Sequence, residues 1–382
     1  MFKHRFLFGL IIVLLGFSAN AINFTRVNIA WQYDPNADLK LSHRVVRVEE
    51  GIYVFMQIAA DSINDWQYEF LAQSGYESED HKLIEATRID TLKEVTGEIM
   101  IKISLEFLEE KLLVVKISQL EKFYYYDINL AVGNLSFPSI YPLDSDGLPI
   151  LTNYINRSEF SWKGNSTFLA RQYQESFPPA DPPMADMSLL APQIDVDTSF
   201  IFGDSVNFLE NHFYVVQKDS LSTVGVTMLK VPPYFPEYRQ LGELVESMLY
   251  LTSEQERKSM LKSRNLKQSF DSFWMNTYST KSRARNAIRK YYDLIENANN
   301  MFTDFKPGWK TDRGMMYITF GLPDEVYRSA NAEEWYYDDG KAFEFTVIST
   351  FFASRTYSLR RSKDLEEQWY TQIATMRRGV NE

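Results

Sequence analysis

The sequence of 382 residues contains no cysteine and only four histidines. Without cysteine the chain has no disulfide, no thiolate metal site, no cysteine nucleophile and no acylated cysteine anchor. The histidines lie far apart and none has a partner at metal-ligand spacing, so we expect no metal site. The sequence also lacks a phosphate-binding Gly-rich loop and a Gly-x-Ser-x-Gly nucleophile elbow. These absences remove most catalytic repertoires, and we predict no catalytic residue and no cofactor.

A surplus of basic charge is also missing. Lysine and arginine number 40 against 51 aspartates and glutamates, which gives a net charge of −11. Proteins that bind nucleic acid normally carry a basic surplus, so we expect no nucleic-acid partner. With 45% hydrophobic and 15% aromatic residues, the chain can fill several cores, which excludes a disordered protein.

The N-terminus has the pattern of a signal peptide over residues 1–21. Lys3 and Arg5 precede an apolar stretch from Phe6 to Phe17 that is short for a membrane span, and Ala19-Asn20-Ala21 resembles a cleavage site. Cleavage there would leave 361 residues with a net charge of −13. We therefore expect an exported protein of the periplasm, or of the periplasmic face of the outer membrane. Without a lipid-bearing cysteine, any membrane association would be indirect; the alternative is an uncleaved anchor.

Residues 22–132 read as a β-sandwich domain. Apolar residues alternate with polar ones at Ile99, Ile101 and Ile103 and again at Leu113, Val115 and Ile117. This period of two is typical of antiparallel strands with one buried face. Residues 133–236 form a second β-rich domain with less regular strands, interrupted by a Pro-rich loop at residues 178–183. Proline removes ladder donors, so that loop is not a central strand.

After Pro236 the apolar period becomes helical, and residues 237–382 read as a helical segment followed by an α+β domain. Ser253 and Glu256 are spaced as a capping box, and Thr280 precedes a long amphipathic stretch to Phe302. We predict strands at residues 315–320, 334–337, 342–348 and 356–360, and a last helix opened by a capping box at Asp364 and Glu367. The fold class is thus mixed: two antiparallel β-sandwich-like domains, then an α+β domain with several helices and a small antiparallel sheet.

The segment 307–328 reads PGWKTDRGMMYITFGLPDEVYR. Trp309 can anchor a turn on a core, Thr311 and Asp312 can bond their own backbone, and Arg313 offers a fork for a carboxylate. Gly314 permits positive φ or a close backbone approach. The local reading is a turn–strand–turn unit with an internal polar brace.

This segment resembles the GWxTD domain, which is named for residues 308–312. The resemblance rests on the residues Gly308, Trp309, Thr311, Asp312, Arg313, Gly314, Gly321, Pro323 and Asp324. Upstream, Phe273-Trp274 fits the same pattern, whereas the loop at residues 275–280 departs from it. The resemblance implies an exported protein of the Bacteroidota or Acidobacteria type with β-rich N-terminal regions. It implies a setting and no particular reaction.

Two chemical interpretations of this segment are open. An Asp312–Arg313 pair can position a carboxylate or phosphate, although a turn aspartate and a buried arginine that brace a loop explain it better. Carboxylates at residues 333, 334, 338 and 339 could supply the acid and base of glycoside hydrolysis. Their positions beside Trp335 are more simply the outward face and the turn of a hairpin.

Four three-residue sequences match the Asp-Ser/Thr-apolar pattern that Bacteroidota use for O-glycosylation. They place candidate acceptors at Ser62, Thr91, Ser205 and Ser220. Glycans there would have to lie on the surface.

Two functions from different classes follow. The first is a non-enzymatic envelope protein that uses its domains as an interaction or scaffold module for envelope protein partners. The second is a hydrolase directed at glycan or peptidoglycan, or a carbohydrate-binding protein, since the 23 tyrosines, 27 phenylalanines and 7 tryptophans can supply stacking platforms for a glycan.

Overall fold

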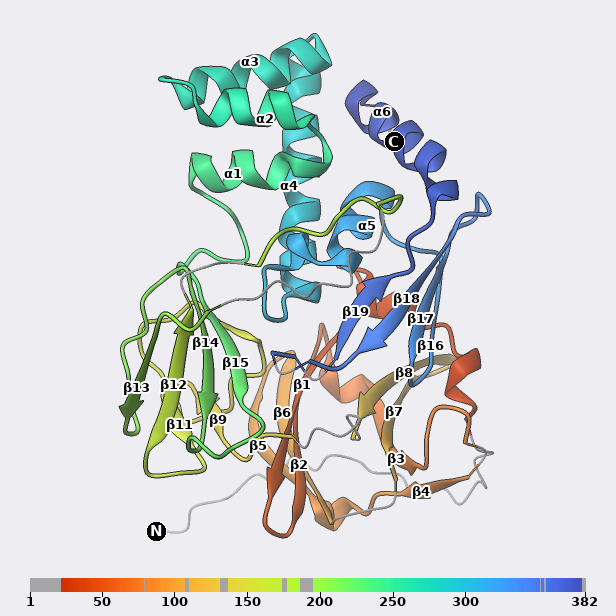
Figure 1. Ribbon diagram of the computed structural model, residues 1–382. Coiled ribbons are helices and arrows are strands. Elements are labelled where there is room, and N and C mark those ends of the chain that lie inside the picture. Colours follow the sequence, from red (N-terminus) through yellow and green to blue (C-terminus); the bar gives the residue numbers. More distant parts are fainter. Residues whose placement is uncertain are drawn as a thin grey trace, which may run out of the picture.

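The computed structural model describes residues 22–78, 80–106, 110–130, 137–173, 177–185, 195–350, 352–353 and 355–379. The predicted signal peptide, residues 1–21, lies outside the described residues. Figure 1 shows two β-modules below and beside a helical and β C-terminal module, so the predicted mixed fold class is confirmed. The division into domains at the predicted boundaries stays a prediction.

The first β-module consists of two four-stranded antiparallel sheets. One sheet has the order β1 (Leu39–Val48), β2 (Gly51–Ala60), β6 (Glu98–Glu106), β5 (Ile89–Val95). The other has the order β4 (His81–Leu83), β3 (Gln67–Gln73), β7 (Leu112–Gln119), β8 (Lys122–Asn129). Both sheets contribute to one core, as Val54 and Ile101 from the first and Val115 and Ile117 from the second show. The alternation read from the sequence thus marks the inner faces of a sandwich.

The second β-module has one larger and one smaller sheet. The five-stranded sheet has the order β10 (Tyr154–Ile155), β15 (Val226–Lys230), β14 (His212–Gln217), β12 (Phe168–Tyr173), β13 (Thr198–Phe202). Only the β10–β15 pair is parallel. The two-stranded sheet pairs β11 (Ser161–Lys163) with β9 (Tyr141–Leu143). Rings from both parts, such as Trp162 and Phe168, share the core.

The C-terminal module begins with four helices, α1 (Leu241–Ser247), α2 (Glu254–Leu261), α3 (Leu266–Tyr278) and α4 (Lys281–Phe302). Ser253 and Glu256 form the predicted capping box of α2, and Thr280 caps α4 by accepting from the Arg283 amide. A four-stranded antiparallel sheet follows in the order β16 (Glu325–Arg328), β17 (Ala332–Tyr336), β18 (Ala342–Ile348), β19 (Thr356–Leu359). The last helix is α6 (Glu366–Arg378).

Two local predictions in this module are wrong. Residues 315–320 do not form a strand, because they belong to helix α5 (Asp312–Phe320). Six of its nine residues are buried, so its apolar run shows no periodicity that separates a helix from a strand. The box at Asp364 and Glu367 does not form either. Ser362 caps the short 3-10 turn Lys363–Leu365 instead, and α6 continues directly from that turn.

Two segments cross from the β-modules onto the C-terminal module. The 3-10 turns Phe24–Arg26 and Ala30–Tyr33 pack against its core, and the Ile29 amide donates to Val326 O at 2.9 Å. The Pro-rich loop is a loop, as predicted, but it lies on the C-terminal module. There the Ala180 amide donates to Lys310 O at 2.8 Å. The N-terminal turns are thus bonded to β16, and the Pro-rich loop is bonded to the turn at Lys310.

Candidate functional site

The site begins with the turn that precedes α5. Residues Gly308–Lys310 form a 3-10 turn, and Thr311 is the N-cap of α5. The Thr311 hydroxyl donates to Gly308 O at 2.7 Å and accepts from the Gly314 amide at 3.0 Å. One threonine therefore closes the turn and starts the helix, which satisfies a backbone donor that would otherwise lack a partner.

Two glycines allow this turn to pack tightly. A Cβ atom on Gly308 would lie 1.8 Å from Ala298 O of α4, and one on Gly314 would lie 1.9 Å from Gly308 O. Neither position has room for a side chain, since the contacting atoms belong to backbone. Of the two roles considered for Gly314, positive φ or a close backbone approach, the structure shows the close approach.

Trp309 faces the core. It is 2% exposed, its Nε1 donates to the Tyr238 hydroxyl at 2.8 Å, and its amide donates to Asn299 Oδ1 at 3.2 Å. The Tyr250 hydroxyl donates to Trp309 O at 3.0 Å. Through its ring and its backbone, Trp309 thus anchors the turn to α4 and to the segments before and after α1.

Asp312 and Arg313 both lie in the first turn of α5 but point to different partners. Asp312 receives two hydrogen bonds from the Arg361 guanidinium, at 2.7 and 3.1 Å, and one from the Leu359 amide at 2.7 Å. Arg313 donates to the Tyr33 hydroxyl at 3.0 Å, lies 3.6 Å from a Glu333 oxygen, and covers the Tyr357 ring at 3.6 Å from its centroid. The two residues therefore do not pair with each other.

The end of the motif is a helix exit and a turn. Gly321 follows α5 with φ of +84°, a conformation that favours glycine. Pro323 is buried, whereas Asp324 is exposed and its carboxylate accepts from the Asp338 amide at 2.7 Å. This aspartate holds two loops together at the surface.

Arg313 belongs to a buried cluster of charges that the sequence did not reveal. Its centre is Arg328 of β16, which contacts Asp127 of β8 at 2.5 Å, Glu333 of β17 at 2.7 Å and the Tyr33 hydroxyl at 2.5 Å. Arg355 lies 3.7 Å from Asp127 on another side. The side chains of Asp127 and Glu333 have no exposed area. The cluster therefore joins the first β-module to the C-terminal module through buried ion pairs.

The cluster shifts the pKa values of its members. Burial alone would raise the pKa of Asp127, but Arg328 and Arg355 outweigh it and hold that pKa below its usual value. Glu333 behaves in the same way under Arg328 and Arg313. Burial lowers the pKa of His43, which bonds the Tyr126 hydroxyl, to about 4. The two acids are thus charged at neutral pH, and this histidine is neutral.

The sequence carried one faint signal of this cluster. Asp127 interrupts an otherwise aromatic and apolar strand, and Glu333 stands beside Trp335. A charged residue inside a strand is rarely buried without a partner. The partner could not be read from the chain, because Asp127 and Arg328 are 201 positions apart.

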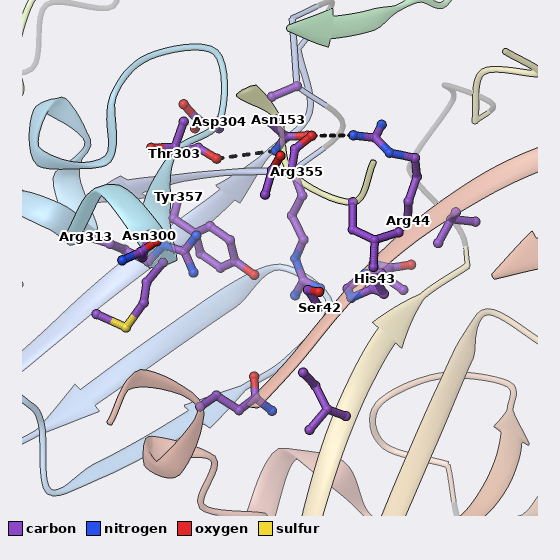
Figure 2. A pocket seen from close by; sticks show the side chains of 18 of the residues that line it. Ser42, His43, Arg44, Asn153, Asn300, Thr303, Asp304, Arg313, Arg355 and Tyr357 are labelled. Carbon is purple, nitrogen blue, oxygen red and sulfur yellow. Dashed lines mark hydrogen bonds between the residues drawn. The ribbon is translucent and has the colours of Figure 1, made fainter. Parts of the chain in front are cut away.

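A cavity of about 710 Å³ opens beside the cluster, between all three modules. Figure 2 shows Arg355 in the middle of the cavity, with Arg44 on one side and Arg313 with Tyr357 on the other. Asn153 of the second β-module donates to Thr303 O across the cavity at 3.4 Å. Of the nine predicted motif residues, only Arg313 lines this space.

The other predicted residues lie apart from it. Ser62, Thr91, Ser205 and Ser220 are all exposed, as glycan acceptors must be. Of the four carboxylates weighed for hydrolysis, Glu333 is buried in the cluster, Glu334 bonds the Tyr336 hydroxyl, and Asp338 and Asp339 are exposed in a turn. Within the described residues, no three acidic or histidine side chains gather as a metal site. The described helices include none that is both long and apolar enough to cross a bilayer.

Comparison with known families gives one match. Residues 212–378 match the GWxTD domain, a range that runs from β14 of the second β-module to the end of α6. No curated protein matches the chain. The family match thus agrees with the resemblance seen in segment 307–328.

Proposed function

We propose that this chain, a GWxTD domain-containing protein, is an exported, non-enzymatic protein of the cell envelope that acts as a scaffold for envelope protein partners. Its place would be the periplasm or the periplasmic face of the outer membrane, reached through the signal peptide at residues 1–21. Membrane association would then be indirect, through those partners.

The observation that carries this proposal is the commitment of the motif's charges to internal contacts. Asp312 is held by Arg361, with both side chains 11% exposed, and Arg313 is held by Tyr33 and Glu333. A catalytic carboxylate has to reach a substrate, and Asp312 already accepts three hydrogen bonds. The motif thus favours an architectural role over a chemical one.

The joints between modules support a scaffold as well. Buried ion pairs connect β8 to β16, and the N-terminal turns and the Pro-rich loop both bond the C-terminal module. Joined modules keep their surfaces at fixed positions, which suits a protein that arranges partners. Apolar side chains remain exposed on the β-modules, with Leu120 97%, Ile201 75% and Leu221 89% exposed.

The test is site-specific photo-cross-linking in the native envelope. A photoreactive residue is placed at Leu120, Ile201 or Leu221 on the β-modules, and at Tyr370 of α6, which is 60% exposed. We expect a discrete adduct with one envelope protein from some positions and none from the others. The absence of adducts, or the same mixture from every position, would contradict a scaffold with a defined partner.

Two further measurements bear on location and on the hydrolase alternative. Fractionation and N-terminal sequencing should find a periplasmic protein that begins at Ile22. Incubation of the purified protein with peptidoglycan and soluble glycans should release no new reducing ends. Release that disappears in Asp324→Asn or Glu334→Gln would instead favour a hydrolase, because Asp324 is exposed and Glu334 is only partly buried, so that a substrate could reach both.

A further inference from the structure

The cavity between the modules has the size and the walls of a ligand site. Its volume of about 710 Å³ lies within the range of about 300–1,000 Å³ that is common for small-molecule pockets. Its walls come from β1 and β8 of the first β-module, from the loop before β10 in the second, and from α4, α5 and β19 of the third. Pockets form preferentially at such domain junctions.

The side chains around this cavity carry a positive net charge, whereas the protein as a whole is negatively charged. Five cationic side chains line it, namely Lys40, Arg44, Arg313, Arg328 and Arg355. Three carboxylates line it as well, Asp34, Asp127 and Asp304, and Glu333 lies behind Arg328. The balance is positive by one charge in a chain whose net charge is −11. A cavity walled by protein focuses such a field and attracts anions.

Arg44 is a cation that is held in place by backbone carbonyls and, as far as the structure describes the chain, by no carboxylate. Its Nε and Nη2 donate to the backbone carbonyls of Ile150 and Thr152, each at 2.6 Å, which fixes the guanidinium at the edge of the cavity. Among the described residues it has no carboxylate partner, and burial alone lowers its pKa to about 10. The third nitrogen, Nη1, makes no hydrogen bond in the described part of the chain. A cation held in place without a counterion is prepared for an anionic ligand.

Arg355 and Arg313 are only partly compensated. Arg355 donates to the Tyr76 hydroxyl and to Ser329 O, and its Nε is buried without a hydrogen-bond partner among the described residues. Its nearest carboxylate, Asp127, is 3.7 Å away and is already bound by Arg328 at 2.5 Å. Arg313 likewise shares Glu333 with Arg328, at 3.6 Å against 2.7 Å. Both acids therefore lie closer to Arg328 than to Arg355 or Arg313.

We propose that this cavity binds a small organic anion through its carboxylate or phosphate group, with Arg44 and Arg355 as the principal contacts. Arginine suits this task because its planar fork matches both groups. This inference goes beyond the scaffold role and does not depend on it. A ligand that bridges Arg44 of the first module and Arg355 of the third would also tighten the junction between them.

The remaining walls fit a ligand body that carries hydroxyl groups. Asn153, Asn300 and Thr303 offer hydrogen-bonding groups. Two aromatic residues, Trp31 and Phe352, also line the cavity. Aromatic faces next to amides are the usual surroundings of a sugar ring. Sugar acids and sugar phosphates are therefore suitable probes, and the neutral sugar of the same size is their control.

The experiment is isothermal titration of the full chain at constant ionic strength with glucuronate, glucose 6-phosphate, inorganic phosphate and glucose. We expect saturable binding of at least one of the three anions and at least tenfold weaker binding of glucose. Binding of glucuronate alone would assign a carboxylate ligand, whereas binding of glucose 6-phosphate or phosphate alone would assign a phosphate. No saturable binding of any of the three anions would overturn the proposal.

Three variants locate the binding. Arg44→Gln removes a cation that has no carboxylate partner among the described residues, and Asn300→Asp adds a negative charge at an exposed position on the wall, where we expect it to be tolerated by the fold. Each should weaken anion binding at least tenfold. Arg285→Gln, at an exposed position of α4 away from the cavity, should bind like the wild type. Unchanged affinity in Asn300→Asp and in a folded Arg44→Gln would place the anion elsewhere and refute the assignment.

Discussion

Asp127 is the residue through which the first β-module enters the buried cluster, and its replacement by asparagine tests the cluster directly. The change keeps the shape of the side chain and removes its charge. Arg328, 8% exposed and 2.5 Å away, then loses one of its two carboxylates, and Arg355 loses its nearest one. The Tyr76 hydroxyl, which donates to Asp127 at 2.7 Å, loses a charged acceptor.

The expected cost is large because the remaining charges are buried. Removal of one partner from a buried ion pair typically destabilises a protein by about 3–5 kcal/mol. In a domain of 150–250 residues, each kcal/mol lowers the melting temperature by roughly 2–4 °C, so we expect a fall of roughly 10 °C. The matched control is Asp38→Asn, since Asp38 pairs with Lys122 of the same β8 strand in an exposed ion pair. It should leave the melting temperature unchanged.

The assay is calorimetric melting at pH 7 and at pH 3, which reports separate transitions if the modules do not unfold together. The folded protein holds the pKa of Asp127 below 3.8, so its contribution is present above that pH and is lost as the pH falls through the folded-state pKa. The gap between wild type and Asp127→Asn should therefore narrow at pH 3. A gap at pH 7 below about 1 kcal/mol, or no larger than that of Asp38→Asn, would refute the reasoning.

Three further predictions concern the turn, the cavity wall and the surface. Gly314→Ala should destabilise the protein by more than about 2 kcal/mol because its Cβ would overlap Gly308 O, whereas Gly242→Ala in α1, where nothing lies within 4 Å, should be neutral or stabilising; equal urea midpoints would contradict this. Burial raises the pKa of Asp304 from 3.8 to about 6, which costs stability as the pH rises from 3.8 through 6. Asp304→Asn should therefore stabilise the protein by about 1–2 kcal/mol at pH 7.5 and not below pH 4, and a pH-independent effect in melting curves would refute the cause. Protein from the native envelope should have a mass above that of its chain because of attached glycans, and alanine replacement of all four exposed acceptors, Ser205 and Ser220 among them, should remove this excess. A mass equal to that of the unmodified chain would exclude the glycans.

The parts of the fold that could be predicted are those with local signals. The capping box of α2 was predicted from two side chains three residues apart, and the cap of α4 from a threonine before a long amphipathic stretch. The predicted strand 342–348 coincides with β18. Helix α5 was missed because burial on all sides removed the amphipathic period, and Thr311, which caps it, was interpreted as a residue of a turn. Local chemistry therefore indicated the turn, whereas the helix that follows it depends on its surroundings.

The cluster and the cavity could not be predicted because they are non-local. Tyr33 meets Arg328 from 295 positions away, and Arg44 faces a space that also takes in Arg355 from the far end of the chain. A single sequence gives no information on which cation a buried acid will meet. It gave only the presence of Asp127 and Glu333 in apolar surroundings, which indicates that partners exist.

The residues of the motif fall into two groups according to where their contact partners lie. Gly308, Trp309 and Thr311 make their contacts within the C-terminal module, where they close the turn and anchor it on α4 and its neighbours. Asp312 also makes its contacts in this module, where it binds Arg361 beyond β19, whereas Arg313 reaches Tyr33 near the N-terminus. The first group fixes the direction in which α5 starts, and that direction aims Arg313 at the junction and its cavity. The turn is therefore best understood as an element that positions Arg313 at the junction between the modules.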